Sequence, residues 1–513
     1  MTGQPSLHSG PHPAAPYPAA SAVPLVAART GRAPALPRQL RDLGALGLIS
    51  VFGLLAGDWV ASLGLAVLFA GWKYLSREPG PPIVAAAFSL QWLQVMVAMV
   101  YVAISGRQIG EMRHADYRPM MLIGLACVVA LFSGFYFAAG FARFKRYRAQ
   151  PLSVLPWSMN RIMVVYLATV AGSGILQELA WSTPGLTQPM LIFSRIRYVF
   201  LYFLITRLIK NRMPWPWVAA ILFTELMLGF TGFFAEFREP LVVVTIAILG
   251  TMDRRRARTW ILVGVLGVLG VLSTIVWTAI KPIVRREYVG VVSRTERLGE
   301  AITVTGATFT IGGPEWKYQS DSMVSRIWAI YFPALALKRV PSIVPHENGK
   351  ILWGAIQNVL TPRMFFPGKA NLPSQSDEVR KYAGVWVAGR ETNTSYAFGY
   401  AAESYVDFGV PLMFVPIFVW GLLIGFAYRW MHKHIVYDEL RIGVLIVIVW
   451  STLAYYEASW LMMVGPTVTI MVIFGGGAVL VGRFLRGTSK KNLRARPRAN
   501  VSAVAPKPYR LSP

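Results

Sequence analysis

The stretch TWILVGVLGVLGVLSTIVWTAI, residues 259–280, decides the fold because it holds no charged side chain over 22 residues. A helix needs about 20 apolar residues to cross the roughly 30 Å hydrocarbon core of a membrane. Every backbone amide in lipid must be hydrogen-bonded within its own segment, so such a run folds as a helix. Basic residues flank it: Arg254, Arg255, Arg256, Arg258 and Lys281.

Similar apolar runs recur along the chain. Of 513 residues, 55% are hydrophobic and only 15% are charged, against about 25% charged in an average soluble protein. The first run, residues 43–75, predicts a hairpin of two short helices turning near Asp58, or one long tilted helix. The other predicted spans are residues 82–105, 118–141, 159–177, 189–209, 214–234, 238–252, 259–280, 409–428, 440–456 and 461–482. The sequence therefore predicts an all-α polytopic membrane protein with about 12 transmembrane helices.

The formal net charge of +27 would suggest nucleic-acid binding in a soluble protein. Here the basic residues cluster at the ends of apolar runs, and the tail after Val481 holds nine Lys or Arg and no acid. Besides the 254–258 group, the clusters are Arg143, Lys145, Arg146 and Arg148, and Arg207, Lys210 and Arg212. This positive-inside distribution predicts that the lipid bilayer is a partner and nucleic acid is not. It places both termini on the cytoplasmic side of the membrane.

The predicted organisation has five parts. Residues 1–41 form a disordered basic cytoplasmic arm, 42–280 an N-terminal transmembrane bundle, and 281–408 one large periplasmic loop. Residues 409–483 form C-terminal transmembrane helices, and 484–513 a basic cytoplasmic tail. Residues 282–408 hold 14 Lys or Arg and 11 Asp or Glu, a net charge of 14 − 11 = +3. Because a loop this long is usually ordered and functional, we expect it to be folded.

Two arginines stand inside a predicted span, in Phe193-Ser-Arg195-Ile-Arg197-Tyr198. An arginine at the centre of a bilayer costs about 2.5–3.5 kcal/mol on insertion scales. Side chains two residues apart on a helix point about 200° apart, so both cannot reach the surface along one face. Either one reaches the surface and the other pairs with Glu178 or Glu225, or they bind an anion such as phosphate.

Further charges are predicted at the same outer level of the membrane. Glu236, Arg238 and Glu239 lie in a tight turn before Pro240, and Arg285 and Arg286 follow the 259–280 span. Each group has a structural alternative, a salt-bridge cluster for the first and interfacial anchoring for the second. Together the arginines from different spans predict a site for a diphosphate group.

The large loop holds the remaining candidates. Arg363 and Lys369 lie in a run with two prolines and aromatic residues. The phrase ETNTSYAFGYAAESYVDF, residues 391–408, contains Glu403 and Tyr405. Aromatic faces beside carboxylates are typical of carbohydrate sites, while an interfacial belt is the alternative for each tyrosine. His346 is expected to be an exposed loop histidine.

Several common motifs are missing from the sequence. It has one cysteine, Cys127, in an apolar run, and no Cys/His cluster with zinc spacing. It also lacks a P-loop, a GxSxG motif and an HExxH motif. We therefore expect no cofactor and no metal.

The layout and the loop residues resemble the bacterial O-antigen or polysaccharide repeat-unit polymerases (Wzy-type). The resemblance covers roughly residues 225–430 and rests on many spans with one large late loop and on Arg238 in a short outer turn. It also rests on Gly349-Lys-Ile, Thr361-Pro-Arg363, Pro367-Gly-Lys369 and Gly399-Tyr-Ala-Ala-Glu403-Ser-Tyr405-Val-Asp-Phe-Gly409. The repeated Arg-x10-Gly pattern of some members is not evident.

The resemblance implies an enzyme of the bacterial inner membrane that uses polyprenyl-diphosphate-linked oligosaccharides at the periplasmic face and makes O-antigen or exopolysaccharide. It would move a growing glycan from its lipid carrier onto a new lipid-linked unit, with a chain-length regulator as a further partner to look for. Such chemistry needs cations for the departing diphosphate and a base for the acceptor hydroxyl. Glu403 is the first candidate for the base, with Glu239 and His346 as alternatives.

Three other functions remain open on the sequence. An O-antigen ligase has the same layout and carrier but transfers the glycan to a lipid A core. A flippase for lipid-linked oligosaccharides would perform no covalent chemistry, but the long outer loop and the missing internal symmetry count against it. A metal-dependent lipid-linked glycosyltransferase would use Asp58 as an acid in the first outer turn.

Overall fold

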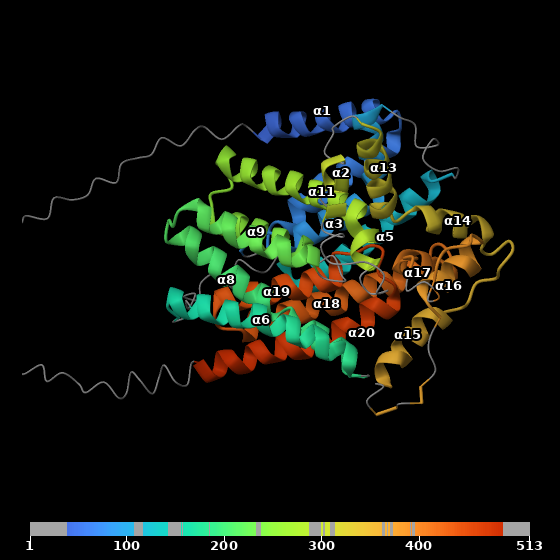
Figure 1. The fold of residues 1–513 in the computed structure, drawn as a ribbon. Helices are drawn as coiled ribbons and strands as arrows, with labels where there is room; N and C mark the ends of the chain where they lie inside the picture. Colours follow the sequence, from blue (N-terminus) through green and yellow to red (C-terminus); the bar gives the residue numbers. More distant parts are fainter. Residues whose placement is uncertain are drawn as a thin grey trace, which may run out of the picture. The chain divides into compact units, whose positions relative to one another are not determined.

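The computed structural model describes most of the chain between residues 38 and 485. The described residues are 38–78, 80–106, 116–141, 155, 157–183, 185–231, 237–286, 299–300, 303–307, 313–361, 365–366, 368–369, 373–389, 391 and 395–485. By compactness, residues up to Gly47 separate from the unit formed by Leu48–Pro513. The described residues form helices joined by turns (Figure 1).

The helices before the large loop are α1 (Arg38–Ala56), α2 (Trp59–Leu75), α3 (Ile83–Ser105), α5 (Arg118–Ala139), α6 (Met159–Ser182), α7 (Thr187–Ser194), α8 (Ile196–Lys210), α9 (Trp215–Thr231), α10 (Arg238–Thr251) and α11 (Ala257–Arg286). Those that follow are α13 (Pro314–Ile327), α14 (Tyr331–Arg339), α15 (Lys350–Leu360), α16 (Gln375–Glu378), α17 (Tyr400–Phe408), α18 (Phe414–His434), α19 (Asp438–Leu453) and α20 (Trp460–Ile470). Two π-helical segments, Val379–Ala383 and Met471–Gly476, extend α16 and α20.

Seven helical stretches of the described chain are long and apolar enough to cross a membrane. They are Ile83–Ser105, Arg118–Ala139, Met159–Ala180, Thr187–Lys210, Ala257–Lys281, Phe414–His434 and Trp460–Leu485. Three shorter helices, Gly44–Ala56, Trp59–Leu75 and Trp215–Phe230, are also apolar. This composition indicates an α-helical membrane protein, as predicted, while the count of about 12 spans and the periplasmic loop stay predictions.

The first apolar run is a helical hairpin, as the first of the two interpretations predicted. α1 ends at Ala56 and α2 begins at Trp59, with Asp58 as the capping residue between them. The Asp58 carboxylate accepts a hydrogen bond from the Val60 amide at 3.0 Å. It also pairs with Arg118 at the start of α5, with 2.7 Å between Nε and Oδ2. Asp58 therefore has a structural role in ending one helix and starting the next.

The predicted span 189–209 is broken in the structure. α7 ends at Ser194 and α8 begins at Ile196, so Arg195 occupies the joint between them. The Arg195 amide bonds to the carbonyl of Ile192, three residues back, which tightens the chain at this point. A continuous apolar pattern does not reveal such a break.

Close packing joins α5 to α18 through glycines. A Cβ atom on Gly421 would lie 2.0 Å from the Leu131 carbonyl oxygen, and one on Gly425 would lie 2.6 Å from the Phe135 carbonyl oxygen. Gly421 and Gly425 form a small-xxx-small pattern on α18, which lets two membrane helices approach at backbone distance. Gly134 of α5 faces this surface, since a Cβ there would lie 2.2 Å from the Phe418 oxygen.

We expect Gly421→Ala to lower the thermal midpoint of the purified protein, because its methyl group would force α5 and α18 apart. Overpacking typically costs about 1–3 kcal/mol. Gly267→Ala in α11 is the matched control, since a Cβ there meets no atom within 4 Å and alanine favours a helix by about 1 kcal/mol. Equal midpoints for the two variants, measured by fluorescence in detergent, would contradict this account of the α5–α18 contact.

Four connections between helices meet at one end of the bundle, here called the basic end. Arg207 of α8 pairs with Glu439 of α19, with 2.8 Å between Nη2 and Oε2. Arg254, before α11, donates to the Gly80 carbonyl, before α3, at 2.5 Å. The Glu78 carboxylate accepts a hydrogen bond from the Tyr428 hydroxyl of α18 at 3.1 Å. The predicted basic loops at 207–212, 254–258 and 429–441 therefore lie together, while Arg143–Arg148 lie outside the described residues.

The segment predicted as the large loop contains α13 to α17. α11 continues to Arg286, past the boundary expected at residue 281. In Figure 1, α14, α15, α16 and α17 gather at the right, and the last described helix, in red, ends at the lower left. These helices are therefore far from the end of the bundle where the described chain finishes.

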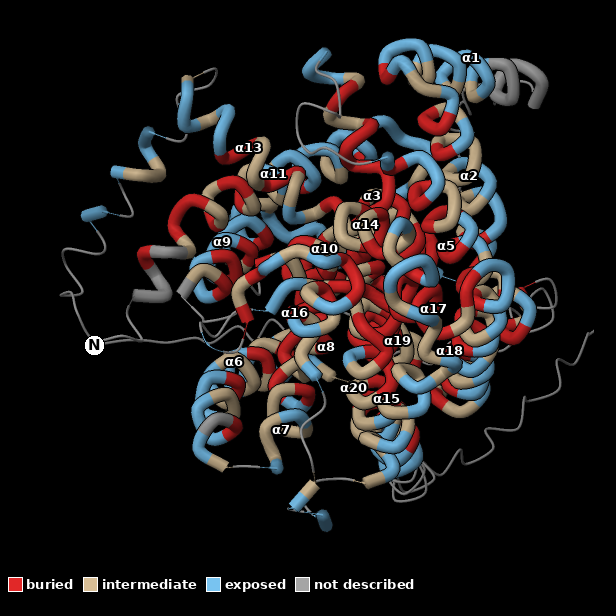
Figure 2. The backbone as a smooth tube through the Cα atoms, turned by 90° about the vertical axis from the view of Figure 1, so that its right-hand side faces the viewer, coloured by how far each residue is buried: buried red, intermediate tan, exposed pale blue. Residues whose placement is uncertain are grey.

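Part of this segment is buried among the other helices. Eight residues of α17, Tyr400 to Asp407, are buried, and α17 contacts α14, α15 and α18 (Figure 2). The Ala329 amide bonds to the Gln94 carbonyl of α3 at 3.0 Å, so the α13–α14 connection also contacts the middle of a spanning helix. Tyr400 and Tyr405 therefore pack inside the protein, whereas the sequence suggested an exposed sugar-binding face or an interfacial belt.

Candidate functional site

At the α7–α8 joint, the side chain of Arg195 contacts α19. Its Nη1 atom donates a hydrogen bond to the Ser451 hydroxyl at 2.5 Å. Arg197, two residues on, is buried and contacts other groups: Nη2 donates to the Tyr198 hydroxyl at 2.6 Å and Nη1 to Ser173 Oγ at 3.4 Å. The two arginines thus have separate surroundings, as the spacing of two residues predicted.

Arg238 and Glu239 begin α10, and Pro240 lies in its first turn. A proline is compatible with a first turn because the amide it lacks would have no partner within the helix. Both charged side chains are half-buried. The positive end of the helix dipole favours a carboxylate such as Glu239 at this position.

The short connection between α19 and α20 brings these charges together. Burial raises the pKa of the Tyr455 phenol, and the Glu239 carboxylate raises it further. The positive charges of Arg238 and Arg195 lower the same pKa. Charges that act on one phenol in this way lie in its neighbourhood, while the predicted diphosphate site of Arg195 and Arg238 stays a prediction.

Glu457 lies two residues further along the same connection. Burial raises the pKa of its carboxyl, while the charges of Arg238 and Arg326 lower it. We call Arg195, Arg238, Glu239, Tyr455 and Glu457 the charge cluster. Within the described part of the chain, Arg195, Arg238 and Glu457 form no ion pair with one another or with any other side chain.

Opposite charges that lie near each other without forming an ion pair can still form hydrogen bonds with another group, such as a substrate. A guanidinium offers five N–H donors in a planar fork that matches phosphate oxygens. A carboxylate accepts hydrogen bonds or a proton. The charge cluster can therefore hold a phosphorylated group on its arginines and receive a proton on Glu457.

Buried polar contacts fix the connection that carries Tyr455 and Glu457. Gln91 of α3 donates to the Leu453 carbonyl at 2.8 Å and accepts from the Tyr400 hydroxyl at 2.8 Å. Gln94 accepts from the Tyr456 amide at 2.5 Å. Because both glutamines are buried, these bonds hold the connection rigidly against α3 and α17.

Glu403 lies on the other side of this connection and is only 1% exposed. Its Oε2 atom accepts a hydrogen bond from the Trp460 amide at the start of α20, at 2.6 Å. Burial and the neighbouring Glu378 carboxyl raise the pKa of Glu403 well above its usual value. Burial likewise raises the pKa of Glu378 to about 7. Glu403 and Glu378 thus form a buried acid pair.

The acid pair gives the stability of the protein a defined pH dependence. Its folded-state pKa values lie above the ordinary value of 4.5, so its contribution to stability is complete below that pH. The contribution is lost as the pH rises through about 7 and the pair ionises. We expect the thermal midpoint to fall between about pH 5 and pH 8, and to fall less in Glu378→Gln, in which one of the two charges cannot form.

Scans of the thermal midpoint against pH would measure this difference. Glu315→Gln is the control, since Glu315 is an exposed residue of α13 and its replacement should leave the wild-type slope. An unchanged slope in Glu378→Gln would show that the pair does not ionise in this range.

The remaining predicted residues lie apart from the charge cluster. The buried Tyr405 hydroxyl donates to the Val340 carbonyl at 2.7 Å. The half-buried His346 lies against the Tyr405 ring, with 5.7 Å between ring centroids, and its Nδ1 is 3.1 Å from the Val406 carbonyl oxygen. Lys369 Nζ donates to the carbonyls of Asn358 and Thr361 at the end of α15. These contacts tie the three side chains to neighbouring groups, and their predicted roles in catalysis or substrate binding stay predictions. Arg363 and the side chains of Arg285 and Arg286 lie outside the described residues.

In the sequence Glu457 is only one acid in a short turn, so local pattern does not mark it as a site residue. Its signal is its position: a carboxylate two residues from Tyr455, between two apolar runs. Gln91 and Gln94 were overlooked too, although two amides inside an apolar span are a recognisable sign of a buried polar contact.

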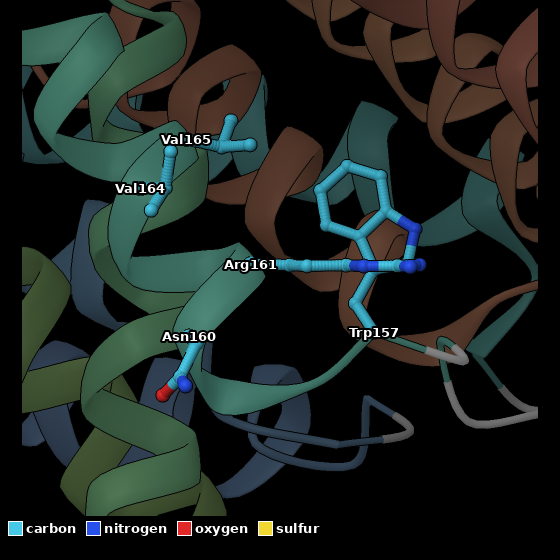
Figure 3. Close-up of a pocket in the computed structure, with 5 residues that line it drawn as sticks. All are labelled: Trp157, Asn160, Arg161, Val164 and Val165. Carbon is cyan, nitrogen blue, oxygen red and sulfur yellow. The ribbon is translucent and has the colours of Figure 1, made fainter.

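A cavity of about 420 Å³ lies at the start of α6, lined by Trp157, Asn160, Arg161, Val164 and Val165. In Figure 3, Trp157 and Arg161 lie on one side and Asn160 points away from them. None of the predicted site residues lines it, and its surface is mostly apolar. It is therefore a weaker candidate for chemistry than the charge cluster. Among the described residues, no three His, Cys, Asp or Glu side chains are grouped to hold a metal ion.

Comparisons with known proteins give one result. No curated protein and no solved structure gives a significant match. A family model described as a domain of unknown function (DUF8712) matches residues 110–432, which is more than half of the 513 residues. The match includes Arg195, Arg238 and Glu403 and ends before Glu457. The chain therefore belongs to the family of the domain of unknown function DUF8712.

Proposed function

We propose that this protein is a membrane glycosyltransferase that polymerises polyprenyl-diphosphate-linked oligosaccharide repeat units at the periplasmic face of the inner membrane. The observation that carries the proposal is the charge cluster, in which Arg195 and Arg238 lie around Tyr455 and Arg238 also acts on Glu457. A diphosphate needs cations that are not already neutralised, and an acceptor hydroxyl needs a nearby base.

The proposed reaction exchanges one bond for another. The acceptor hydroxyl oxygen attacks the anomeric carbon of the growing glycan and forms the new glycosidic bond. The bond from that carbon to the diphosphate oxygen breaks, and its electron pair leaves with the polyprenyl diphosphate. The hydroxyl proton passes to the base. Charge develops on the departing oxygen, where fixed arginines stabilise the transition state most.

The geometry supports Glu457 as the base and Glu403 as a positioning residue. Glu457 is electrostatically coupled to Arg238, so one substrate could contact both. Glu403 is buried and bonded to the Trp460 amide, two residues past Ala458, whose carbonyl accepts from the Tyr400 amide at 2.7 Å. Glu403 thus orients the connection that carries Glu457. Glu239 remains the alternative base within the charge cluster.

The depth of the cluster fits a lipid-linked substrate. From the basic end, α8 and α10 run 15 and 14 residues, which is about 20 Å of helix. A membrane core is about 30 Å thick, so the cluster would lie about 10 Å below the opposite surface. A diphosphate attached to a polyprenyl chain can approach such a recessed site from the lipid.

The proposed topology has twelve spans, with both termini in the cytoplasm and residues 281–408 as the periplasmic loop. The broken helix α7–α8 counts as one span, and α1, α2, α9, α10 and α19 supply the short ones. The grouping of the basic connections at one end supports this arrangement, because positive residues favour the cytoplasmic side.

We expect Ser342→Cys to react with a membrane-impermeant maleimide from the periplasm in intact cells. Ala257→Cys, at the basic end, should react only after permeabilisation. Both positions are exposed, and the native Cys127 is buried, so the unsubstituted protein is the control for background labelling. Labelling of Ala257→Cys and not of Ser342→Cys in intact cells would reverse the topology and rule out periplasmic polymerisation.

Release of the lipid carrier tests the proposed chemistry. Purified protein in nanodiscs would be offered a lipid-linked repeat unit, and free polyprenyl diphosphate would be measured by mass spectrometry. Transfer breaks the bond between sugar and diphosphate and releases the carrier, whereas a flippase leaves this bond intact. Absence of release by folded protein with accessible substrate would contradict the proposal and favour transport.

A further inference from the structure

A second pocket, with two arginines in its lining, lies at the basic end, away from the charge cluster. It has a volume of about 370 Å³ and is formed where the α8–α9 and α10–α11 connections meet. Arg212 and Arg258 supply its charge, and Met213, Trp215, Val218 and Met252 supply apolar surface. A pocket that combines two cations with apolar walls is suited to an amphiphile with a negative head.

Arg212 adopts a backbone conformation that is unusual for its residue type. Its φ angle is +54°, in the left-handed region where glycine normally stands at the end of a helix. The Met213 amide bonds back to the Leu208 carbonyl at 3.0 Å, which is the hydrogen bond of such a helix end. A non-glycine residue here costs about 1–2 kcal/mol. Glycine would therefore give a more stable turn at this position than arginine.

Arg258 stands on the opposite wall, one residue into α11. Its guanidinium carbon lies 5.8 Å from the centre of the Trp215 ring. Trp215 is the first residue of α9 and Ala257 the first of α11, so two helix N-termini begin at the pocket. The positive ends of two helix dipoles add to the charges of the arginines and favour an anion.

The nearby acids have other partners. Glu439 pairs with Arg207 at 2.8 Å and with Lys210 at 3.4 Å. Asp253 accepts from the Arg255 amide at 3.0 Å and lies 3.9 Å from Arg256. Among the described residues, no carboxylate pairs with Arg212 or Arg258. Their charges are available to a ligand.

The helices that lead from the pocket offer surface for an acyl chain. Exposed apolar side chains continue along both of them, Trp217 and Phe223 on α9 and Ile261 and Val265 on α11. Only 17% of the most apolar stretch of α11 is buried within the protein. A lipid headgroup in the pocket could therefore keep its chains in the hydrocarbon layer.

We propose that this pocket binds the phosphate of an anionic phospholipid, held by Arg212 and Arg258 at the basic end of the bundle. The charge, the two helix ends and the apolar walls all match a bilayer lipid with a phosphate headgroup. The site is separate from the charge cluster, about 20 Å of helix away along α8 and α10, and does not depend on the proposed glycosyltransferase activity.

The test compares variants that lose equal charge. Delipidated protein would be titrated with phosphatidylglycerol in detergent, with bound lipid counted by native mass spectrometry and phosphatidylcholine as the neutral lipid. We expect Arg212→Ala with Arg258→Ala to weaken phosphatidylglycerol binding about ten- to thirtyfold, since each arginine near a membrane surface contributes about 1 kcal/mol. Arg255→Ala with Arg256→Ala, which removes the same charge outside the pocket, should weaken it less than about twofold.

Arg212→Gly separates binding from folding. Glycine fits the left-handed turn, so this variant should keep or raise the thermal midpoint without lipid and still lose binding. If the two double variants lost phosphatidylglycerol binding equally, only total charge would matter, and the proposed site at Arg212 and Arg258 would be wrong. If inorganic phosphate displaced phosphatidylglycerol at equal concentration, the pocket would be a site for a soluble anion, and the proposal of a lipid ligand would be wrong.

Discussion

Replacing Arg238 by alanine is expected to lower the rate of polymer formation by about 10²–10³-fold, the effect of removing one fixed donor from a developing anion. Arg238 belongs to the charge cluster and acts on both Tyr455 and Glu457. The described residues offer its guanidinium no carboxylate partner within ion-pair distance. Loss of this guanidinium should therefore weaken the stabilisation of the departing diphosphate and leave the fold nearly unchanged.

The measurement is the initial rate of carrier release by purified variants, beside their thermal midpoints. Arg238→Lys should recover little activity, because an ammonium group cannot form the bidentate contact of a guanidinium. Arg255→Ala at the basic end is the control for loss of one positive charge and should keep the wild-type rate. Full activity in Arg238→Ala would remove Arg238 from the diphosphate site.

Glu457→Gln is expected to lower the same rate by about 10²–10⁴-fold, the usual contribution of a general base. Glutamine keeps the size of the side chain and most of its hydrogen bonding but cannot accept the proton. Burial raises the pKa of Glu457, and only its ionised form acts as a base. The wild-type rate should therefore fall on the acid side through a pKa above the ordinary 4.5, and this limb should vanish in Glu457→Gln.

Glu403→Gln and Glu239→Gln are the comparisons for this assignment. Glutamine at 403 can still accept the Trp460 amide, so we expect the chain to keep growing. Glu403→Ala would leave that amide unsatisfied, which costs about 1–3 kcal/mol of stability. Loss of activity in Glu403→Gln together with normal activity in Glu457→Gln would return the role of the base to Glu403.

The sequence predicted those parts of the fold that depend on local pattern. Apolar runs indicated the helices, and Asp58 marked the hairpin because a capping carboxylate interrupts an otherwise apolar stretch. The sequence also predicted that Arg195 and Arg238 lie at one level, and both charges act on the Tyr455 phenol. A charge inside an apolar run must find a polar environment, and two such charges at one level are expected to share it.

The rest of the site depends on contacts between distant segments, which local pattern cannot show. The charge of Arg238 acts on Glu457, which lies in the α19–α20 connection that Gln91 and Gln94 hold. Glu403 belonged to an aromatic phrase typical of an exposed sugar site, yet α17 is buried. The apolar content of such a helix is compatible with either placement, and its packing partners decide between them.

The most direct test of the central claim is the length of the glycan that the purified protein makes. Wild-type protein in nanodiscs would receive a synthetic polyprenyl-diphosphate-linked repeat unit, and the products would be separated on a glycan gel. The account predicts a ladder of lipid-linked products that differ by one repeat unit and that is absent with Arg238→Ala. Substrate that stays at one repeat unit with folded wild-type protein would contradict a polymerase, and transfer of single units to an added lipid A core would instead identify a ligase.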